Sequence, residues 1–209
     1  MLIDFNYIVK KYGRPKGVIH IGAHLAEERS VYIQNGLDNT IWIEANPKIF
    51  NNISFLNNIN NSEIALNYLI SDIDDKEYIF NVTNNGQSSS ILELDKHKIH
   101  HPHIFVSEQM SIKSKRMDTI IKENFINIKD FDFINLDIQG AELLALKSFG
   151  DLLSDFRFIY TEVNLTSIYK DCVLIKELDE YLSNFGFRRV ETEITEYEWG
   201  DALYIKMVV

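Results

Sequence analysis

Five residues that could do chemistry each stand at the end of a short apolar run. They are Gly22, Glu44, Asp72, Asp137 and Glu162. Such runs predict strands, and in an open α/β sheet ligands bind beyond the carboxyl ends of the strands. One carboxylate at a strand end can simply cap a helix or face solvent. Four of them, meeting at one edge of a sheet, predict a binding crevice.

The spacing of Gly22 and Glu44 limits the kinds of ligand that this crevice could bind. Their separation of 22 residues is typical of a βαβ unit in which the carboxylate binds both hydroxyls of a ribose. A dinucleotide turn needs three glycines, but residues 22–26 (GAHLA) have only the first. Glu27 and Glu28 then fall in the expected first helical turn, where they would repel a diphosphate and tolerate a cation. These features favour S-adenosylmethionine over a dinucleotide.

Length and composition predict one domain that spans residues 1–209. The chain is 45% hydrophobic and has a formal net charge of −10, so it lacks the overall basic charge of a nucleic-acid or anionic-lipid binder. Cys172 is the single cysteine, which excludes an intramolecular disulfide. We expect no membrane span, because no apolar run approaches ~20 residues, and a cytoplasmic location, because the first residues do not resemble a signal peptide.

Apolar spacing predicts alternating helices and strands, and hence a mostly parallel sheet with helices on both faces. The expected helices are 2–12, within an N-terminal capping segment 1–16, then 26–36, 47–56, one capped by Asp118, 141–149 closed by Gly150, and 174–185. The expected strands are 17–21, 40–44, 63–70, 76–82, 112–116, 131–137, 156–162, 187–195 and 202–209. The last two strands form an antiparallel hairpin, which a sheet of the NAD-binding type does not require.

Residues 83–115 are the least regular part of the chain, and we interpret them as an insertion on the acceptor side. Long irregular connections in compact domains are usually functional. Gln87, Ser88 and Ser89 are therefore candidates for contact with a substrate. The four histidines within 97–103 match no tight metal-ligand template, so we expect them to be solvated or to contact the acceptor, and we predict no metal site.

Four segments resemble the FkbM family of S-adenosylmethionine-dependent methyltransferases. They are residues 22–28 (GAHLAEE), 42–47 (WIEANP), 135–142 (NLDIQGAE) and 199–204 (WGDALY). The run LDIQGAE is the most specific of them. The family commonly carries a glycine in the loop where this chain has Ala26. The resemblance implies a seven-stranded, Rossmann-like class I methyltransferase sheet. It also implies methylation of a hydroxyl on a sugar or other secondary metabolite.

The resemblance also implies roles by position. Cofactor contacts would come from Gly22, Ala23 and Glu28 at the methionine part, Glu44 at the ribose, Ser71 and Asp72 near adenine, and Asp137 and Gln139 near the methyl group; His24, Ala45 and Asn46 are further cofactor-binding candidates. An alcohol is a weak nucleophile, so a base would help to remove its proton. The candidates are Asp137 and Glu162, followed by His101.

The sequence thus predicts an S-adenosylmethionine-dependent O-methyltransferase that acts on a saccharide or related small molecule, with no nucleic-acid partner. One alternative is an NAD(P)-dependent oxidoreductase built on a similar βαβ unit. Another is a non-catalytic cofactor-binding or scaffold protein with the same fold, since fold alone does not determine activity. The identity of the acceptor, the choice of base and the oligomeric state are left open.

Overall fold

The core of the molecule is a seven-stranded sheet in the order β3-β2-β1-β7-β8-β10-β9. The computed structural model describes residues 1–58 and 62–207. The first five strands of this order, from β3 through β2, β1 and β7 to β8, pair in parallel. Strand β10 is antiparallel to both of its neighbours, β8 and β9. The strands are β1 (Val18–Ile21), β2 (Thr40–Ile43), β3 (Glu63–Leu66), β7 (Phe133–Leu136), β8 (Phe158–Asn164), β9 (Phe187–Ile194) and β10 (Trp199–Lys206). The predicted mixed sheet with a C-terminal hairpin is confirmed.

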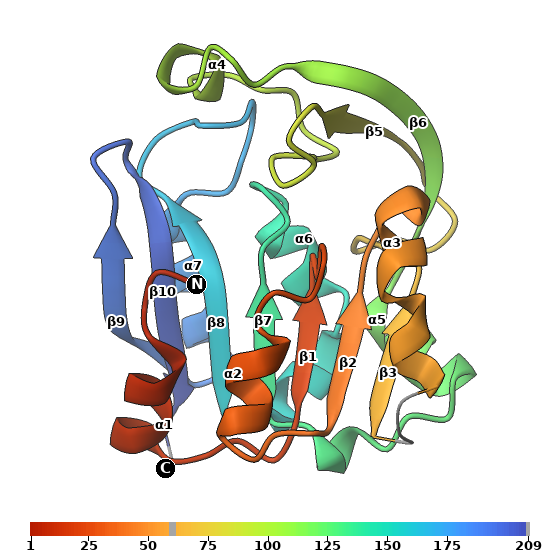
Figure 1. Cartoon of the computed structure of the whole chain (residues 1–209). Coiled ribbons are helices and arrows are strands. Elements are labelled where there is room, and N and C mark those ends of the chain that lie inside the picture. Colours follow the sequence, from red (N-terminus) through yellow and green to blue (C-terminus); the bar gives the residue numbers. More distant parts are fainter. Residues whose placement is uncertain (59–61, 208–209) are drawn as a thin grey trace.

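Helices cover both faces of this sheet (Figure 1). One face carries α1 (Phe5–Tyr12), α2 (Arg29–Gln34) and α3 (Pro47–Ile53), and the other carries α5 (Met117–Glu123), α6 (Glu142–Lys147) and α7 (Ile175–Ser183). Short 3-10 helices are η1 (Ser54–Asn58), η2 (Ile128–Asp130) and η3 (Gly150–Asp155). Within the described ranges, no helix is both long and apolar enough to cross a bilayer.

The alternation of side chains along each strand creates two buried layers. Val18 of β1 packs in the layer that contains Phe5 and Tyr32, whereas Ile19 packs in the layer that contains Met117 and Ala145. Successive strand residues point to opposite faces, so a strand buried on both sides is apolar throughout. This double burial fixes the strand ends firmly, and the functional residues follow those ends.

A second, three-stranded sheet lies above the carboxyl edge of the large sheet (Figure 1). Its order is β4 (Leu69–Ile70), β6 (Val106–Lys115) and β5 (Glu77–Thr83). Between β5 and β6 lies the cap, defined here as residues 84–105, which contains the short helix α4 (His97–His100). The expectation that residues 83–115 are irregular is wrong for residues 106–115. They form one regular strand, which begins six residues before the predicted strand 112–116. Half of the β6 residues are exposed, and the apolar alternation that predicted the strand 112–116 marked only the end of it.

Two other predicted boundaries are wrong near the carboxyl edge. The expected strand 63–70 is two strands, because the chain turns at Asn67, whose side-chain amide donates to the backbone carbonyls of Glu44 (2.7 Å) and Ala45 (3.2 Å). The helix expected from residue 26 begins only at Arg29. Ala26 has φ +57°, a left-handed conformation that a right-handed helix cannot include.

Further boundaries differ for local reasons. Asp118 is not the cap of α5: Arg116 holds that position, and Asp118 lies in the first turn, paired with the Arg116 guanidinium at 2.6 Å. Helix α6 ends at Lys147, and Gly150 begins η3. Strand β10 begins at Trp199, three residues before the expected start, and the predicted positions 208–209 lie outside the described residues.

Candidate active site

The turn after β1 is built so closely that only glycine fits at its first position. Gly22 has φ +85°, and a Cβ added there would lie 1.9 Å from the backbone oxygen of Asp137. The backbone N–H groups of Gly22 and Ala23 both donate to the carbonyl of Ile43, at 2.9 and 3.0 Å. The turn is therefore pressed against the ends of β2 and β7, which brings residues from three strands together.

Glu44, at the end of β2, is held in one orientation by the backbone. Its Oε2 accepts from the N–H of His24 (2.9 Å) and its Oε1 accepts from the N–H of Asn46 (2.7 Å). The residue is buried, and burial raises the pKa of its carboxyl. Each carboxylate oxygen can accept more than one hydrogen bond. Glu44 can thus accept hydrogen bonds from two further donors, such as adjacent hydroxyls.

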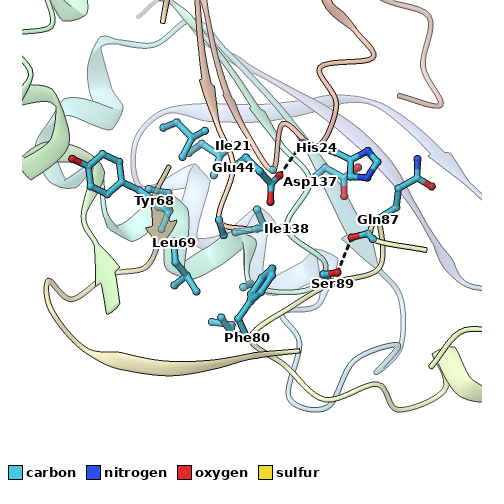
Figure 2. Close-up of a pocket in the computed structure, with 17 residues that line it drawn as sticks. Ile21, His24, Glu44, Tyr68, Leu69, Phe80, Gln87, Ser89, Asp137 and Ile138 are labelled. Atoms are coloured by element: carbon cyan, nitrogen blue, oxygen red, sulfur yellow. Dashed lines mark hydrogen bonds between the residues drawn. The ribbon is translucent and has the colours of Figure 1, made fainter. Parts of the chain in front are cut away.

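An apolar cavity opens beside Glu44. Figure 2 shows Tyr68, Leu69 and Phe80 on one side of it, and His24, Asp137 and Gln87 on the other. The remaining lining residues include Ile21, Gly22, Ile43, Ala45, Ile70, Ser89, Ile91, Ile138 and Ala141. A flat apolar group that is joined to a pair of hydroxyls matches this combination of walls and carboxylate.

A larger and more polar cavity, called the polar cavity below, lies between the edge of the large sheet and the cap. Its walls include Ala23, Glu28, Ser88, His97, His101, Gln139, Glu162, Tyr169 and Trp199. Four residues line both cavities, namely Gly22, His24, Gln87 and Asp137. The two spaces therefore meet at the turns after β1 and β7, and a group bound in one can reach a group bound in the other.

Carboxylates and an amide form a network at this junction. The side-chain amide of Gln139 donates to Asp137 Oδ1 (2.5 Å) and Glu162 Oε2 (2.8 Å), and its oxygen accepts from the Tyr169 hydroxyl (2.5 Å). Burial is the main cause that raises the pKa of Asp137 to about 6. The pKa of Glu162 is raised well above its usual range, by burial and then by the charges of Asp137 and Glu142. Acidic groups crowded in this way favour a bound cation.

The turn after β7 holds this network in place. Gln139 has φ +59° and Gly140 has φ +99°, so two successive residues are left-handed. Fully buried Glu142 supports the turn by accepting from the backbone N–H groups of Gly140 (3.0 Å) and Ile138 (3.3 Å). A Cβ on Gly140 would lie 2.8 Å from Cys172 Cβ. The run 137–142 is thus a structural unit that aims Asp137 and Gln139.

Most of the site residues expected from the sequence do lie together. Gly22, Ala23, His24, Glu28, Glu44, Ala45, Asp137, Gln139, Glu162, His101, Gln87, Ser88 and Ser89 all line at least one of the two cavities. Asn46 lines neither, and contributes the N–H that orients Glu44. Of the three cap residues, Ser88 lines the polar cavity, Ser89 lines the apolar cavity, and Gln87 lines both.

Ser71 and Asp72 are not brought to either cavity. Ser71 is buried, and its hydroxyl pairs with that of Tyr78 at 2.8 Å. Because β3 ends at Leu66, the residues at the cavity wall are Tyr68 and Leu69. A polar residue, Asn67, follows the apolar run and was the available signal for this earlier strand end.

Sequence reasoning missed Tyr169, which lines the polar cavity and which no spacing marked. His97 was considered only as one of four histidines that are solvated or contact the acceptor, and Trp199 only as part of the family-like run 199–204; both line the same cavity. Among the described residues, no group of three or more histidine, cysteine, aspartate or glutamate side chains is arranged to hold a metal ion.

Fold and site together define a Rossmann-like methyltransferase. The chain belongs to the FkbM methyltransferase family: the model of the methyltransferase FkbM domain matches residues 20–189. The cofactor is S-adenosylmethionine, and the protein is an S-adenosylmethionine-dependent methyltransferase. No curated protein matches the chain in sequence.

Solved structures share the fold at low sequence identity. TrmK from M. capricolum, in complex with S-adenosyl-homocysteine, has a TM-score of 0.54 at 9% identity, covering 99% of this chain and 70% of that one. Sp1610 from Streptococcus pneumoniae, whose proposed activity is tRNA (m1A22) methylation, has a TM-score of 0.52 at 10% identity, with coverage of 98% and 70%. A SAM-dependent methyltransferase from Aquifex aeolicus has a TM-score of 0.50 at 10% identity, with coverage of 97% and 89%. These similarities concern the fold alone.

Proposed function

We propose that the protein transfers the methyl group of S-adenosylmethionine to a hydroxyl oxygen of a sugar or related polyhydroxylated small molecule. The proposal rests on how two carboxylates at the junction are placed relative to the two cavities. Asp137 lines both cavities, whereas Glu162, which is bridged to it through Gln139, lines only the polar one. One carboxylate can thus face the cofactor while the other faces the acceptor.

The apolar cavity and its rim suit each part of the cofactor. Glu44 would accept the ribose hydroxyls, and Tyr68 and Phe80 would contact adenine. Asp137 and Glu28 would face the positive charges of the methionine part. When bound, the cofactor supplies a methyl group on a sulfonium, which is a good leaving group. The task that remains for the protein is to hold an acceptor oxygen beside it and to take its proton.

The charge of the polar cavity supports a neutral acceptor. Of the described residues that line it, none is a lysine or an arginine, while Glu27, Glu28, Asp137 and Glu162 are carboxylates. Proteins bind nucleic-acid phosphates mainly through lysine and arginine. The lining therefore disfavours a phosphate-rich acceptor such as tRNA. Hydroxyl groups, which can donate to carboxylates and accept from amides, suit it well.

Glu162 is our preferred base. It is buried, it lines the acceptor side only, and its raised pKa makes its carboxylate a stronger proton acceptor than a solvated glutamate. Asp137 would then keep its place beside the cofactor. His101 lines the same cavity and is the second candidate, although burial and the neighbouring histidines lower its pKa and weaken it as a base.

Calorimetric titration with S-adenosylhomocysteine tests the cofactor half of this proposal. Glu44→Ala removes a charged acceptor of two hydroxyl hydrogen bonds, so we expect a loss of affinity of about 10- to 100-fold. Asp72→Ala is the matched control, since Asp72 lines neither cavity, and it should bind as wild type does. Thermal unfolding of both variants checks that they are folded. Equal affinity of wild type and Glu44→Ala would remove Glu44 from the ribose site.

A further inference from the structure

The histidines of the cap are not equivalent, and His97 stands apart from the others. It is only 6% exposed, whereas His103 is exposed and His100 and His101 are half-buried. It lines the polar cavity, and its Nδ1 has no hydrogen-bond partner among the described residues. Leaving a buried polar nitrogen unpaired costs roughly 1–3 kcal/mol. His97 lines the cavity, and a bound group that reached this buried nitrogen would remove that cost by pairing with it.

The chemistry of the ring defines the kind of group. Burial, followed by the charges of His101, His100 and His103, lowers the pKa of His97 to about 4. The imidazole is therefore neutral near pH 7, with one nitrogen that donates and one that accepts. A neutral ring gives no charge attraction to a phosphate or a carboxylate. It pairs well with a hydroxyl, which can serve as donor or acceptor as the ring requires.

The position of His97 relative to the carboxylates is set by packing. Its ring lies against that of Tyr169, with 5.5 Å between centroids, and the Tyr169 hydroxyl donates to Gln139. Gln139 in turn donates to Asp137 and Glu162. The backbone also anchors the ring, because the N–H of His97 donates to the carbonyl of Ile168 at 3.1 Å. His97 is thus fixed on a wall of the polar cavity that these contacts join to the proposed base.

We propose that His97 determines acceptor specificity by hydrogen-bonding, through Nδ1, a second hydroxyl of the molecule whose first hydroxyl meets Glu162. This inference rests on the proposed function, which supplies a hydroxylated acceptor. It adds that the acceptor is a polyol with at least two suitably spaced hydroxyl groups, and that His97 contacts the one that is not methylated.

Three substitutions at His97 separate hydrogen bonding from packing. His97→Phe keeps a ring and removes the hydrogen bond. His97→Asn places an amide near the position of Nδ1 and should rescue binding, whereas His97→Gln, which is one bond longer, should not. His100→Phe is the control on the same helix, because His100 packs against Tyr197 and does not line the polar cavity.

The assay measures methyl transfer from S-adenosylmethionine to a panel of methyl glycosides of common hexoses and 6-deoxyhexoses. For the best glycoside, His97→Phe and His97→Gln should raise KM about 10-fold or more, with little change in kcat. His97→Asn and His100→Phe should stay close to wild type. A deoxy glycoside that lacks the recognised hydroxyl should have the same KM with wild type and His97→Phe, because the partner is already absent.

The outcomes distinguish failure of the inference about His97 from failure of the proposed function. If wild type methylates a glycoside and His97→Phe has an unchanged KM, the inference is overturned and the proposed function stands. If His97→Phe is unstable, the contrast between His97→Asn and His97→Gln decides, and equal KM values for those two overturn the inference. If wild type binds S-adenosylhomocysteine but methylates no glycoside, the proposed acceptor class fails and the inference fails with it.

Discussion

The two cavities of this methyltransferase share four lining residues and otherwise have different walls. The apolar cavity is bounded by the ends of β1 and β2, the residues after β3, the turn after β7 and the first part of the cap, and Glu44 on its wall is oriented by two backbone N–H groups. The polar cavity is bounded by the turns after β1 and β7, the cap, a loop around Ile168 and Tyr169, and the start of β10. In the apolar cavity Glu44 is thus oriented before a ligand binds, whereas His97, on the wall of the polar cavity, has an Nδ1 with no hydrogen-bond partner among the described residues.

The largest effect should come from Gly22→Ala, which attacks the framework of the cofactor side. A methyl group would meet the Asp137 carbonyl oxygen at 1.9 Å, and φ +85° is unfavourable for alanine. The β1 turn would have to move away from β7, so we expect a destabilisation of about 3 kcal/mol or more and loss of cofactor binding. Thermal unfolding and calorimetry measure both. Normal S-adenosylhomocysteine affinity in a folded variant would show that the close approach is not needed.

The next effect separates the two cavities by function. Glu162→Gln keeps the size of the side chain and removes the proposed base, so kcat should fall by about 100-fold or more. Affinity for S-adenosylhomocysteine should change little, because Glu162 lines the polar cavity only. Single-turnover kinetics and calorimetry provide the two readouts. If kcat were retained while cofactor affinity fell, the assignment of Glu162 to the acceptor side would be wrong.

A smaller effect should appear in the pH dependence of cofactor binding. The pKa of Asp137 is about 6 without ligand, and a cation beside it favours the ionised form. Affinity for S-adenosylmethionine should therefore rise about tenfold between pH 5 and pH 7.5, and affinity for uncharged-sulfur S-adenosylhomocysteine should rise less. Calorimetry across this range measures both. A flat profile for S-adenosylmethionine would place its charge away from Asp137.

The same group links pH to the stability of the unliganded protein. Because burial raises the pKa of Asp137 from 3.8 to about 6, the folded protein holds a proton that the unfolded chain releases. The resulting stabilisation is complete below the lower value and is lost as pH rises through the upper one. Tm should fall from pH 5 to pH 7.5, and less steeply in Asp137→Asn. An unchanged slope in Asp137→Asn would contradict the buried, protonated state.

The smallest effect concerns a single position on the cofactor side. Ala26 has φ +57°, a conformation that glycine adopts with less strain. Ala26→Gly also removes a buried methyl group and loosens the unfolded chain, which offsets part of the gain. We expect a net stabilisation of about 0.5 kcal/mol, seen as a Tm rise of roughly 1–2 °C. A clear fall in Tm would mean that packing of the methyl group outweighs the strain.

The sequence located most of the strand ends that line the apolar cavity, because backbone geometry leaves recognisable residues there. Gly22 marks a turn that excludes a side chain, and Glu44 follows a buried apolar run at the spacing of a ribose site. Where a strand end was misplaced, the expected residue does not line the cavity: the run 63–70 hid the break after Leu66, so Ser71 and Asp72 were chosen, whereas Tyr68 lies on the cavity wall. Errors on this side were errors of a few residues.

The acceptor side could be located but not described. Residues 83–115 were recognised as unusual, yet apolar alternation marked only the last part of β6, and the cap is held by contacts distant in sequence, such as the backbone hydrogen bonds that Asp95 and His97 donate to Ile168. The burial of His97 comes from such contacts, with Tyr169 and Ile168, which lie about 70 residues away along the chain. Four nearby histidines look alike in sequence, and only tertiary packing distinguishes them.

The central claim is that these two cavities together methylate a neutral hydroxyl. Its most direct test is methyl transfer from S-adenosylmethionine with an isotopically labelled methyl group, offered the glycoside panel and, separately, tRNA. We expect label on a glycoside, in an ether linkage that survives mild alkali, and none on tRNA. Label on tRNA, or label that alkali releases as from a methyl ester, would contradict the proposed function.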